Sequence, residues 1–181
     1  MSESAIVPTV WGLFTGERGD QLPALTRLVG PFPPIAGSEG WVAIGWPALG
    51  SMKIWENDYA TYYKKFRIVY DEGVERIIAM RANELWNFAF EMKLNDWVIS
   101  PCSSEGVLLV GKIQGEYEFD PGDAKSAVRR DFVHFRKVRW LYVIKSSDAR
   151  YKKLNRIGRL TLSRSNLIYD ELQITLQDIE R

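Results

Sequence analysis

The sequence has little of what metal and redox sites require. Its 181 residues include one cysteine, Cys102, and one histidine, His134. A lone cysteine cannot form an internal disulfide, and one Cys with one His cannot supply the four ligands of a structural zinc site. We therefore expect a chain without a metal or other cofactor, in a reducing compartment such as the cytoplasm.

Long apolar runs are also absent. No stretch approaches the roughly 18–20 apolar residues that cross a bilayer, and the first ten residues lack the basic segment of a signal peptide. The composition, 46% hydrophobic and 26% charged, is that of an ordinary globular protein. These features predict one soluble domain over residues 1–181, with no membrane partner.

Catalytic signatures are weak. Glu91 and Lys93, with Asp71 upstream, superficially match the carboxylate and lysine set of metal-dependent nucleases, but that set lies on a strand and this pair ends a predicted helix. His134 has no evident nucleophile partner in the sequence, although a pair with Cys102 formed only in space stays open. The sequence therefore predicts a binding protein rather than an enzyme.

Aromatic residues and an uneven charge are what the sequence has in excess. It contains 7 Trp, 8 Tyr and 8 Phe. The net charge is only +1, yet residues 125–164 carry 13 basic and 2 acidic residues, whereas residues 1–124 carry 10 basic and 17 acidic ones. A local basic stretch favours a polyanionic partner, and aromatic rings can stack on bases. Nucleic acid is therefore the expected partner.

Hydrophobic periodicity and turn residues predict a mixed α+β order of elements. Strands are expected over residues 9–15, 41–46, 96–100, 107–113, 116–119, 134–144 and 160–162. Helices are expected over residues 56–66, 74–92 and 151–157, with a closing amphipathic segment at 166–179. Several short strands separated by turns favour a small mixed barrel over a βαβ sheet.

An ordered series of motifs within residues 9–145 resembles a known family. The motifs are Trp41-Val-Ala-Ile-Gly-Trp46, Asp96-x-Val98-Ile99-x-Pro101, Gly111-x-Ile113-x-Gly115-x-Tyr117 and His134-x-Arg136-x-Val138-x-Trp140. Together they are similar to the PUA-like domain, related to EVE domains, at the N-terminus of Mrr-type modification-dependent restriction proteins. Asn95 stands where this family usually has a glycine.

The resemblance implies a PUA-like pseudo-barrel flanked by helices, with a pocket for a flipped and modified base. It also implies a reader of DNA, favoured over RNA, in a prokaryotic restriction or defence system with a nuclease or motor as effector partner. Residues 146–181 then add a basic helix, a strand and a closing helix. An RNA-binding PUA-like module and a nucleotide-sensing regulatory subunit stay open as alternatives, because the sequence carries no signature that separates them.

The expected base pocket is aromatic with polar groups at its edge. Flipping a base costs a few kcal/mol of unstacking, and stacking on a ring returns roughly 1–3 kcal/mol. Trp46 ends an apolar strand and suits the mouth of a barrel as well as a core. The other pocket candidates are Trp11, Trp86, Asn87, Ser100 and Tyr117, for which packing in the core or on an element's surface is the alternative.

Phosphate contacts are expected from the basic stretch. The candidates are Arg129, Arg130, His134, Arg136, Lys137, Lys152 and Lys153. The alternative is a solvated face whose charges pair with acidic residues elsewhere in the chain.

Overall fold

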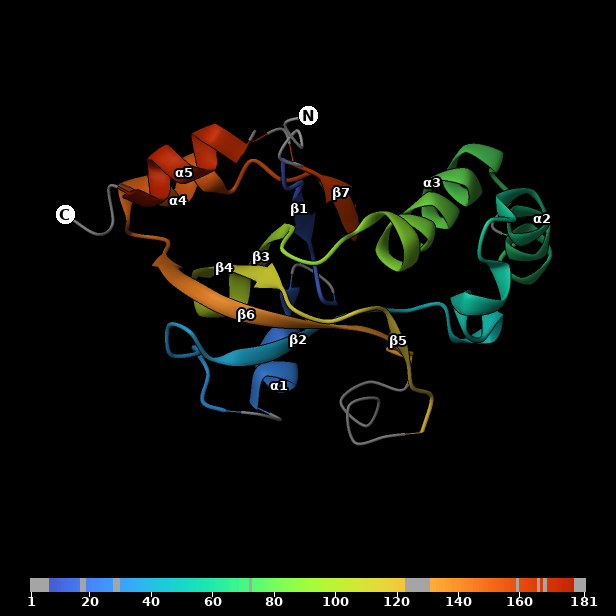
Figure 1. Ribbon diagram of the computed structural model, residues 1–181, viewed down its shortest axis with the longest axis horizontal. Coiled ribbons are helices and arrows are strands. Elements are labelled where there is room, and N and C mark those ends of the chain that lie inside the picture. Colours follow the sequence, from blue (N-terminus) through green and yellow to red (C-terminus); the bar gives the residue numbers. More distant parts are fainter. Residues whose placement is uncertain are drawn as a thin grey trace, which may run out of the picture.

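The computed structural model describes residues 7–16, 19–27, 30–71, 73–122, 131–158, 160–165, 167 and 169–177. These residues form a mixed α+β fold in which helices flank a curled, half-barrel sheet (Figure 1). The strands are β1 (Val10–Leu13), β2 (Glu39–Ile44), β3 (Trp97–Cys102), β4 (Val107–Ile113), β5 (Glu118–Phe119), β6 (His134–Lys145) and β7 (Leu162–Arg164). The α-helices are α1 (Leu22–Arg27), α2 (Tyr59–Val69), α3 (Glu75–Trp86), α4 (Ala149–Leu154) and α5 (Tyr169–Gln177). Short 3-10 turns are η2 (Pro47–Leu49), η3 (Met52–Trp55) and η5 (Ser103–Glu105), and η4 (Asn87–Glu91) is π-helical.

The sheet curls around its longest strand, β6. The strand order is β2-β6-β4-β3-β1-β7, with β5 paired to β6, and only the β1–β3 pair is parallel. The first half of β6 pairs with β2 and β5, whereas its second half pairs with β4 across a register shift at Val110/Gly111. A bulge of this kind bends a strand and increases its twist. The predicted α+β class and strand-rich barrel-like sheet are confirmed at this coarse level.

Both faces of the central strands are buried, which explains their continuous apolar runs. On β3, Val98 belongs to the main core, while Trp97 and Ile99 pack in a second cluster with Leu154 of α4 and Leu172 of α5. Helices α4 and α5 therefore cover one face of the sheet, as Figure 1 also shows.

Two glycines make room for the indole of Trp140 in the main core. A Cβ added to Gly40 on β2 would lie 2.4 Å from the Trp140 Nε1 atom, and one added to Gly111 on β4 would lie 2.9 Å from Cε3. Such distances are far below van der Waals contact, so both neighbouring strands need a residue without a side chain opposite this ring.

The helices α2 and α3 pack together at one end of the molecule (Figure 1). Asp58 caps α2 by accepting a hydrogen bond from the Thr61 backbone N–H at 3.0 Å. The Tyr62 hydroxyl donates to the Ala82 carbonyl at 2.8 Å, which ties the two helices together. The helix predicted over residues 74–92 is confirmed as α3 followed by η4. Helix α1 was not predicted.

Candidate functional site

A cleft of 570 Å³ opens where α2 and α3 meet the sheet. Its walls come from segments far apart in the sequence: the loops after β1 and β2, the end of α2, the middle of α3, and the segments that precede β6 and β7. The lining consists of Gly16, Gly45, Trp46, Pro47, Tyr70, Arg81, Asp131, Phe132 and Thr161. This volume and this mixture of rings with a few polar groups are typical of small-ligand sites.

Trp46 has an unusual backbone conformation at the edge of this cleft. Its φ of 69° lies in the left-handed region, which bulky residues rarely adopt. The side chain is partly buried, and its ring centroid lies 6.2 Å from that of Phe66. Positions of this kind persist only where the surroundings hold them, and they cluster at functional sites.

A buried hydrogen-bond chain holds the Trp46 carbonyl. His134 Nε2 lies 3.3 Å from this oxygen, and a carbonyl only accepts, so Nε2 carries the proton. The neutral ring therefore accepts at Nδ1 from the Tyr117 hydroxyl at 2.6 Å. The Tyr117 oxygen in turn accepts from the Met52 backbone N–H at 3.0 Å. This chain links the segment before β5, β6, η3 and the turn before η2, and it holds the strained turn that presents Trp46.

His134 is neutral in this arrangement. It is completely buried, and burial lowers the pKa of its ring to about 4. Its predicted role in phosphate binding is wrong for this structure, because both ring nitrogens are engaged inside the protein and neither reaches solvent. The same engagement leaves no free nitrogen for a catalytic pair with Cys102.

The cleft brings opposite charges together beside its rings. The guanidinium of Arg81 and the carboxylate of Asp131 both belong to the lining. Glu84, one turn after Arg81, is 4% exposed and is hydrogen bonded by the backbone and side chain of Thr161. Burial raises the pKa of the Glu84 carboxyl to about 7. The wall thus offers donors and acceptors to a ligand with a polar edge.

Glu84→Gln is expected to change how stability depends on pH. Because the folded pKa is raised, the contribution of the protonated carboxyl is complete below about 4.5 and is lost as pH rises through about 7. The variant should be more stable than the wild type by roughly 1–3 kcal/mol at about pH 8, and should match it near pH 4. Urea unfolding at several pH values measures this difference.

His134 acts in the opposite direction in the wild type. Its lowered pKa gives a contribution that is complete above 6.5 and is lost as pH falls through about 4. Between about pH 4 and pH 7 the two groups change the free energy of unfolding in opposite directions, so their effects partly cancel in the wild type. Glu84→Gln removes the contribution of Glu84 and leaves that of His134. Glu105→Gln, on an exposed turn, is the control, and equal pH profiles for the two variants would contradict the assignment.

The predicted base-pocket residues do not come together. Trp46 lines the cleft, but Trp11, Ser100 and Tyr117 are at most 4% exposed and so contact no ligand here. The Trp11 Nε1 donates to Asp96 at 2.8 Å, and the Ser100 hydroxyl donates to the Leu13 carbonyl at 2.8 Å. Their expected pocket roles are corrected to core roles, since their polar atoms are already satisfied by the protein.

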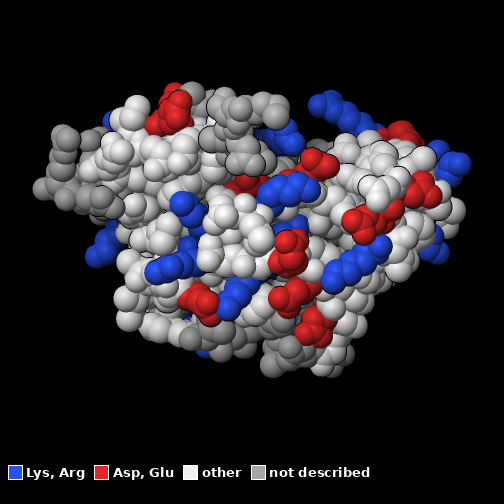
Figure 2. Space-filling view, in the orientation of Figure 1, with Lys and Arg blue, Asp and Glu red and all other residues white. Residues whose placement is uncertain are grey.

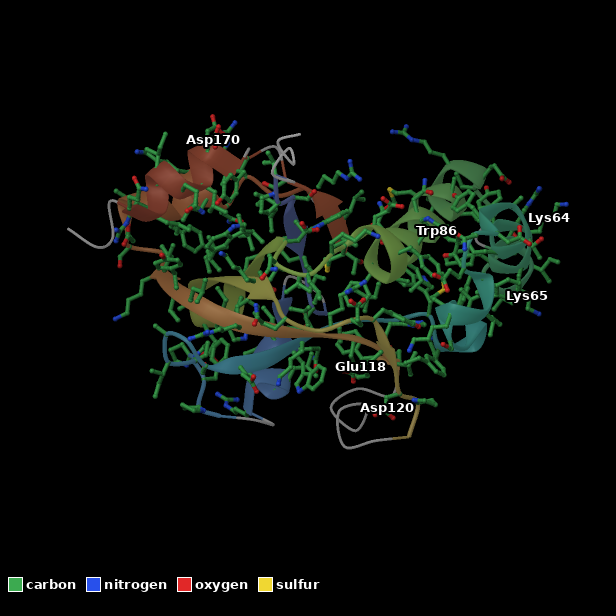
Figure 3. All side chains as sticks on the ribbon, viewed as in Figure 1. Lys64, Lys65, Trp86, Glu118, Asp120 and Asp170 are labelled. Carbon is green, nitrogen blue, oxygen red and sulfur yellow. The ribbon has the colours of Figure 1, made fainter. Side chains whose placement is uncertain are left out.

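Trp86 and Asn87 lie at the junction of α3 and η4. Trp86 is partly buried between α3 and α2 (Figure 3), with its ring centroid 5.0 Å from Tyr59 and 4.5 Å from Phe90. Asn87 is also partly buried and begins η4, where its carbonyl accepts from the Met92 N–H. Neither residue belongs to the cleft lining. Trp86 packs against α2 instead, and Asn87 contributes a backbone hydrogen bond within η4.

The predicted phosphate-binding residues do not lie together either. Arg136 is 2% exposed and donates to three backbone carbonyls, so its predicted contact with phosphate is wrong for this structure. Lys137 pairs with Glu39 at 2.8 Å. Lys152 and Lys153 are exposed on α4, and Arg129 and Arg130 lie outside the described residues.

The exposed lysines of α4 are remote from the cleft. Helix α4 lies at the end of the sheet away from α2 and α3, the helices that contribute to the cleft walls (Figure 1). On the face seen in Figure 2, Lys and Arg side chains are interspersed with Asp and Glu side chains. The exposed lysines of α4 therefore do not adjoin the cleft.

Sequence reasoning missed most of the cleft. Tyr70, Arg81, Asp131, Phe132 and Thr161 carry no local motif, and they meet only through the packing of α2, α3 and the sheet. Alternation along β6 was a usable signal, since the even-numbered residues from 134 to 140 are all buried. It places His134 and Arg136 on the core side of the strand.

Residues 36–164, more than two thirds of the sequence, match a family described as "Domain of unknown function (DUF8426)". The chain belongs to this family. The DUF8426 match runs from the loop before β2 to the end of β7, so it contains every cleft residue except Gly16. No curated protein and no solved structure matches the chain.

Two further findings concern the part of the chain that the structure describes. It contains no group of three His, Cys, Asp or Glu side chains placed to hold a metal ion. None of its helices combines the length and the apolar character needed to cross a membrane.

Proposed function

We propose that this protein is a non-enzymatic, PUA-like reader that binds nucleic acid and encloses one flipped, modified base in the cleft. The observation that carries the proposal is Trp46, a bulky aromatic residue in a left-handed conformation at the cleft edge. Tyr70 and Phe132 add two further rings to the lining. Stacking between rings is the usual way in which proteins hold an unpaired base.

Polar groups in the same wall support recognition of a base edge. Arg81 supplies donors, and Asp131 supplies acceptors. Every natural base presents both kinds of group along its edges, so one guanidinium and one carboxylate match such a ligand better than they match a purely anionic one. We favour DNA in a restriction or defence system, with a nuclease or motor as effector, on the motif resemblance given above.

A free nucleotide is the second candidate ligand. It is favoured by the distance between the cleft and the exposed lysines of α4, because a mononucleotide needs no extended basic surface. The two candidates differ in whether a strand longer than one nucleotide improves binding.

Trp46→Leu is expected to weaken binding by roughly 1–3 kcal/mol, the usual effect of removing one stacking ring. Labelled duplex, single-stranded and RNA oligonucleotides, each unmodified, methylated or hydroxymethylated, would be titrated by fluorescence anisotropy, together with free nucleotides. Thermal unfolding of the same preparations would show whether the fold is retained.

Trp55→Leu is the matched control. Trp55 is also a partly buried tryptophan packed against the main core, but it does not line the cleft. Both variants should lose similar stability, and only Trp46→Leu should lose affinity. No binding to any oligonucleotide or nucleotide, or equal affinity in the two variants, would refute the proposed function.

A further inference from the structure

One face of α2 points away from the rest of the molecule. Lys64, Arg67 and Ile68 recur at helical spacing on α2, and with Asp71 just past its end they line a shallow hollow of 460 Å³. Ile68 is 76% exposed, the largest exposed fraction among the large hydrophobic residues of the described chain. Figures 1 and 3 place α2 at one end of the molecule, with Lys64 and Lys65 on its outer side. Another molecule could approach this face without meeting the sheet.

Ile68 is the exposed apolar side chain of this face. Its neighbours in the hollow are the charged residues Lys64, Arg67 and Asp71. A large apolar side chain that is 76% exposed and framed by charges of both signs suits a small protein contact.

The charges of this face are complementary to those of a second, antiparallel copy of the same face. Lys64 lies one turn before Ile68 on α2 and Asp71 lies just past the C-terminal end of α2, and both line the same hollow, so an antiparallel second copy places the basic end of each face against the acidic end of the other. In a two-fold interface, residue i contacts residue j and residue j contacts residue i. A two-fold axis between Arg67 and Ile68 brings Lys64 opposite Asp71 of the partner subunit, and this pair then occurs twice.

We propose that this face, the α2 surface, binds a second copy of this chain as a two-fold symmetric dimer. Ile68 of each copy lies next to the axis and enters the hollow of the other. Arg67 keeps its intrachain partner, Glu75, at 3.3 Å, and Asp58 is the acidic neighbour of Lys64 within its own chain. The second copy brings Asp71 to Lys64 in addition to Asp58 of the same chain.

The dimer is expected to be weak and reversible. One helix face buries less than the roughly 800 Å² per partner of a standard interface, and exposed ion pairs contribute little. Dimerisation does not depend on the proposed ligand, so an experiment that refutes the dimer leaves the proposed function untouched, and the reverse is also true.

Sedimentation equilibrium of the full chain tests the α2 surface at concentrations from about 10 µM to about 1 mM. The wild type should show a monomer–dimer equilibrium within this range. Lys64→Asp and Asp71→Lys should each weaken self-association by about tenfold or more, because each places like charges opposite one another twice. A 1:1 mixture of the two variants should form a heterodimer, since each then supplies the charge that the other lacks.

Lys152→Asp, the same charge change on exposed α4, is the control and should leave self-association unchanged. The mixture also guards against misfolding, because an unfolded variant could not be rescued by the other. A wild type that stays monomeric at about 1 mM would overturn the proposal. Single variants that dimerise like the wild type, or a mixture that does not associate, would overturn it equally.

Discussion

Arg136→Met is expected to lower the free energy of unfolding by about 3–5 kcal/mol. The Arg136 guanidinium is 2% exposed and donates to the carbonyls of Phe88 at 2.7 Å, Ala89 at 2.9 Å and Gly115 at 3.2 Å. Removing it leaves the buried carbonyls of Phe88 and Ala89 and the partly buried carbonyl of Gly115 without this donor, and each orphaned buried group costs roughly 1–3 kcal/mol before relaxation. Urea unfolding monitored by tryptophan fluorescence gives the change.

Arg136 holds η4 through the carbonyls of Phe88 and Ala89. Arg136→Lys is the second variant, because it tests whether a positive charge alone is enough. Burial lowers the pKa of the guanidinium to about 10, but the group still carries its charge at neutral pH. Arg136→Lys keeps a positive charge but loses the planar guanidinium that reaches several carbonyls at once. It should therefore show most of the loss in unfolding free energy expected for Arg136→Met.

Lys137→Met is the neighbouring control for Arg136. Lys137 is partly exposed and makes one surface ion pair with Glu39, so its loss should cost less than about 1 kcal/mol. An Arg136 variant that unfolds like the wild type but no longer binds oligonucleotides would restore the phosphate-binding role.

Trp11→Ala should destabilise the fold by about 3–5 kcal/mol, the range found for truncating a large buried ring. Trp11 is fully buried, and its indole N–H donates to Asp96 at 2.8 Å. Asp96 also accepts from the backbone N–H groups of Thr9 and Lys93 at 2.8 and 2.9 Å. The ring therefore closes a buried network that joins β1 to the start of β3.

Trp11→Phe separates the hydrogen bond from the packing. It keeps most of the apolar volume and removes one donor from a buried carboxylate, so we expect a loss of roughly 1–3 kcal/mol. Thermal and urea unfolding of both variants would measure the two contributions. If Trp11→Ala melted with the wild type and lost only ligand affinity, Trp11 would be a pocket residue after all.

Much of the secondary structure could be predicted from local patterns. Tyr62 and Phe66 recur at helical spacing and are the residues that α2 buries. The apolar run at 107–113 became β4, which is covered on both faces. Helix α1 was missed because its six residues contain a proline and carry no extended amphipathic pattern.

The candidate site could be predicted only in one residue, Trp46. Spacing indicated that this tryptophan follows a buried strand, which is correct. Nothing local indicated its left-handed backbone, because that conformation depends on His134, a residue 88 positions away. The charge pattern of the sequence gave a wrong prediction for Arg136, because the burial of this residue also depends on contacts far away in the sequence.

The sequence by itself determined the order and type of most elements, because periodic burial and turn chemistry act between residues close in the chain. Only the tertiary structure decided which polar side chains are buried and which face a ligand. The pairing of β6 with β2, β4 and β5 turned His134 and Arg136 inward. The packing of α2 and α3 against the sheet assembled the cleft from segments that have no contact along the sequence. Long-range contacts depend on the register and curvature of the whole sheet, which no local pattern encodes.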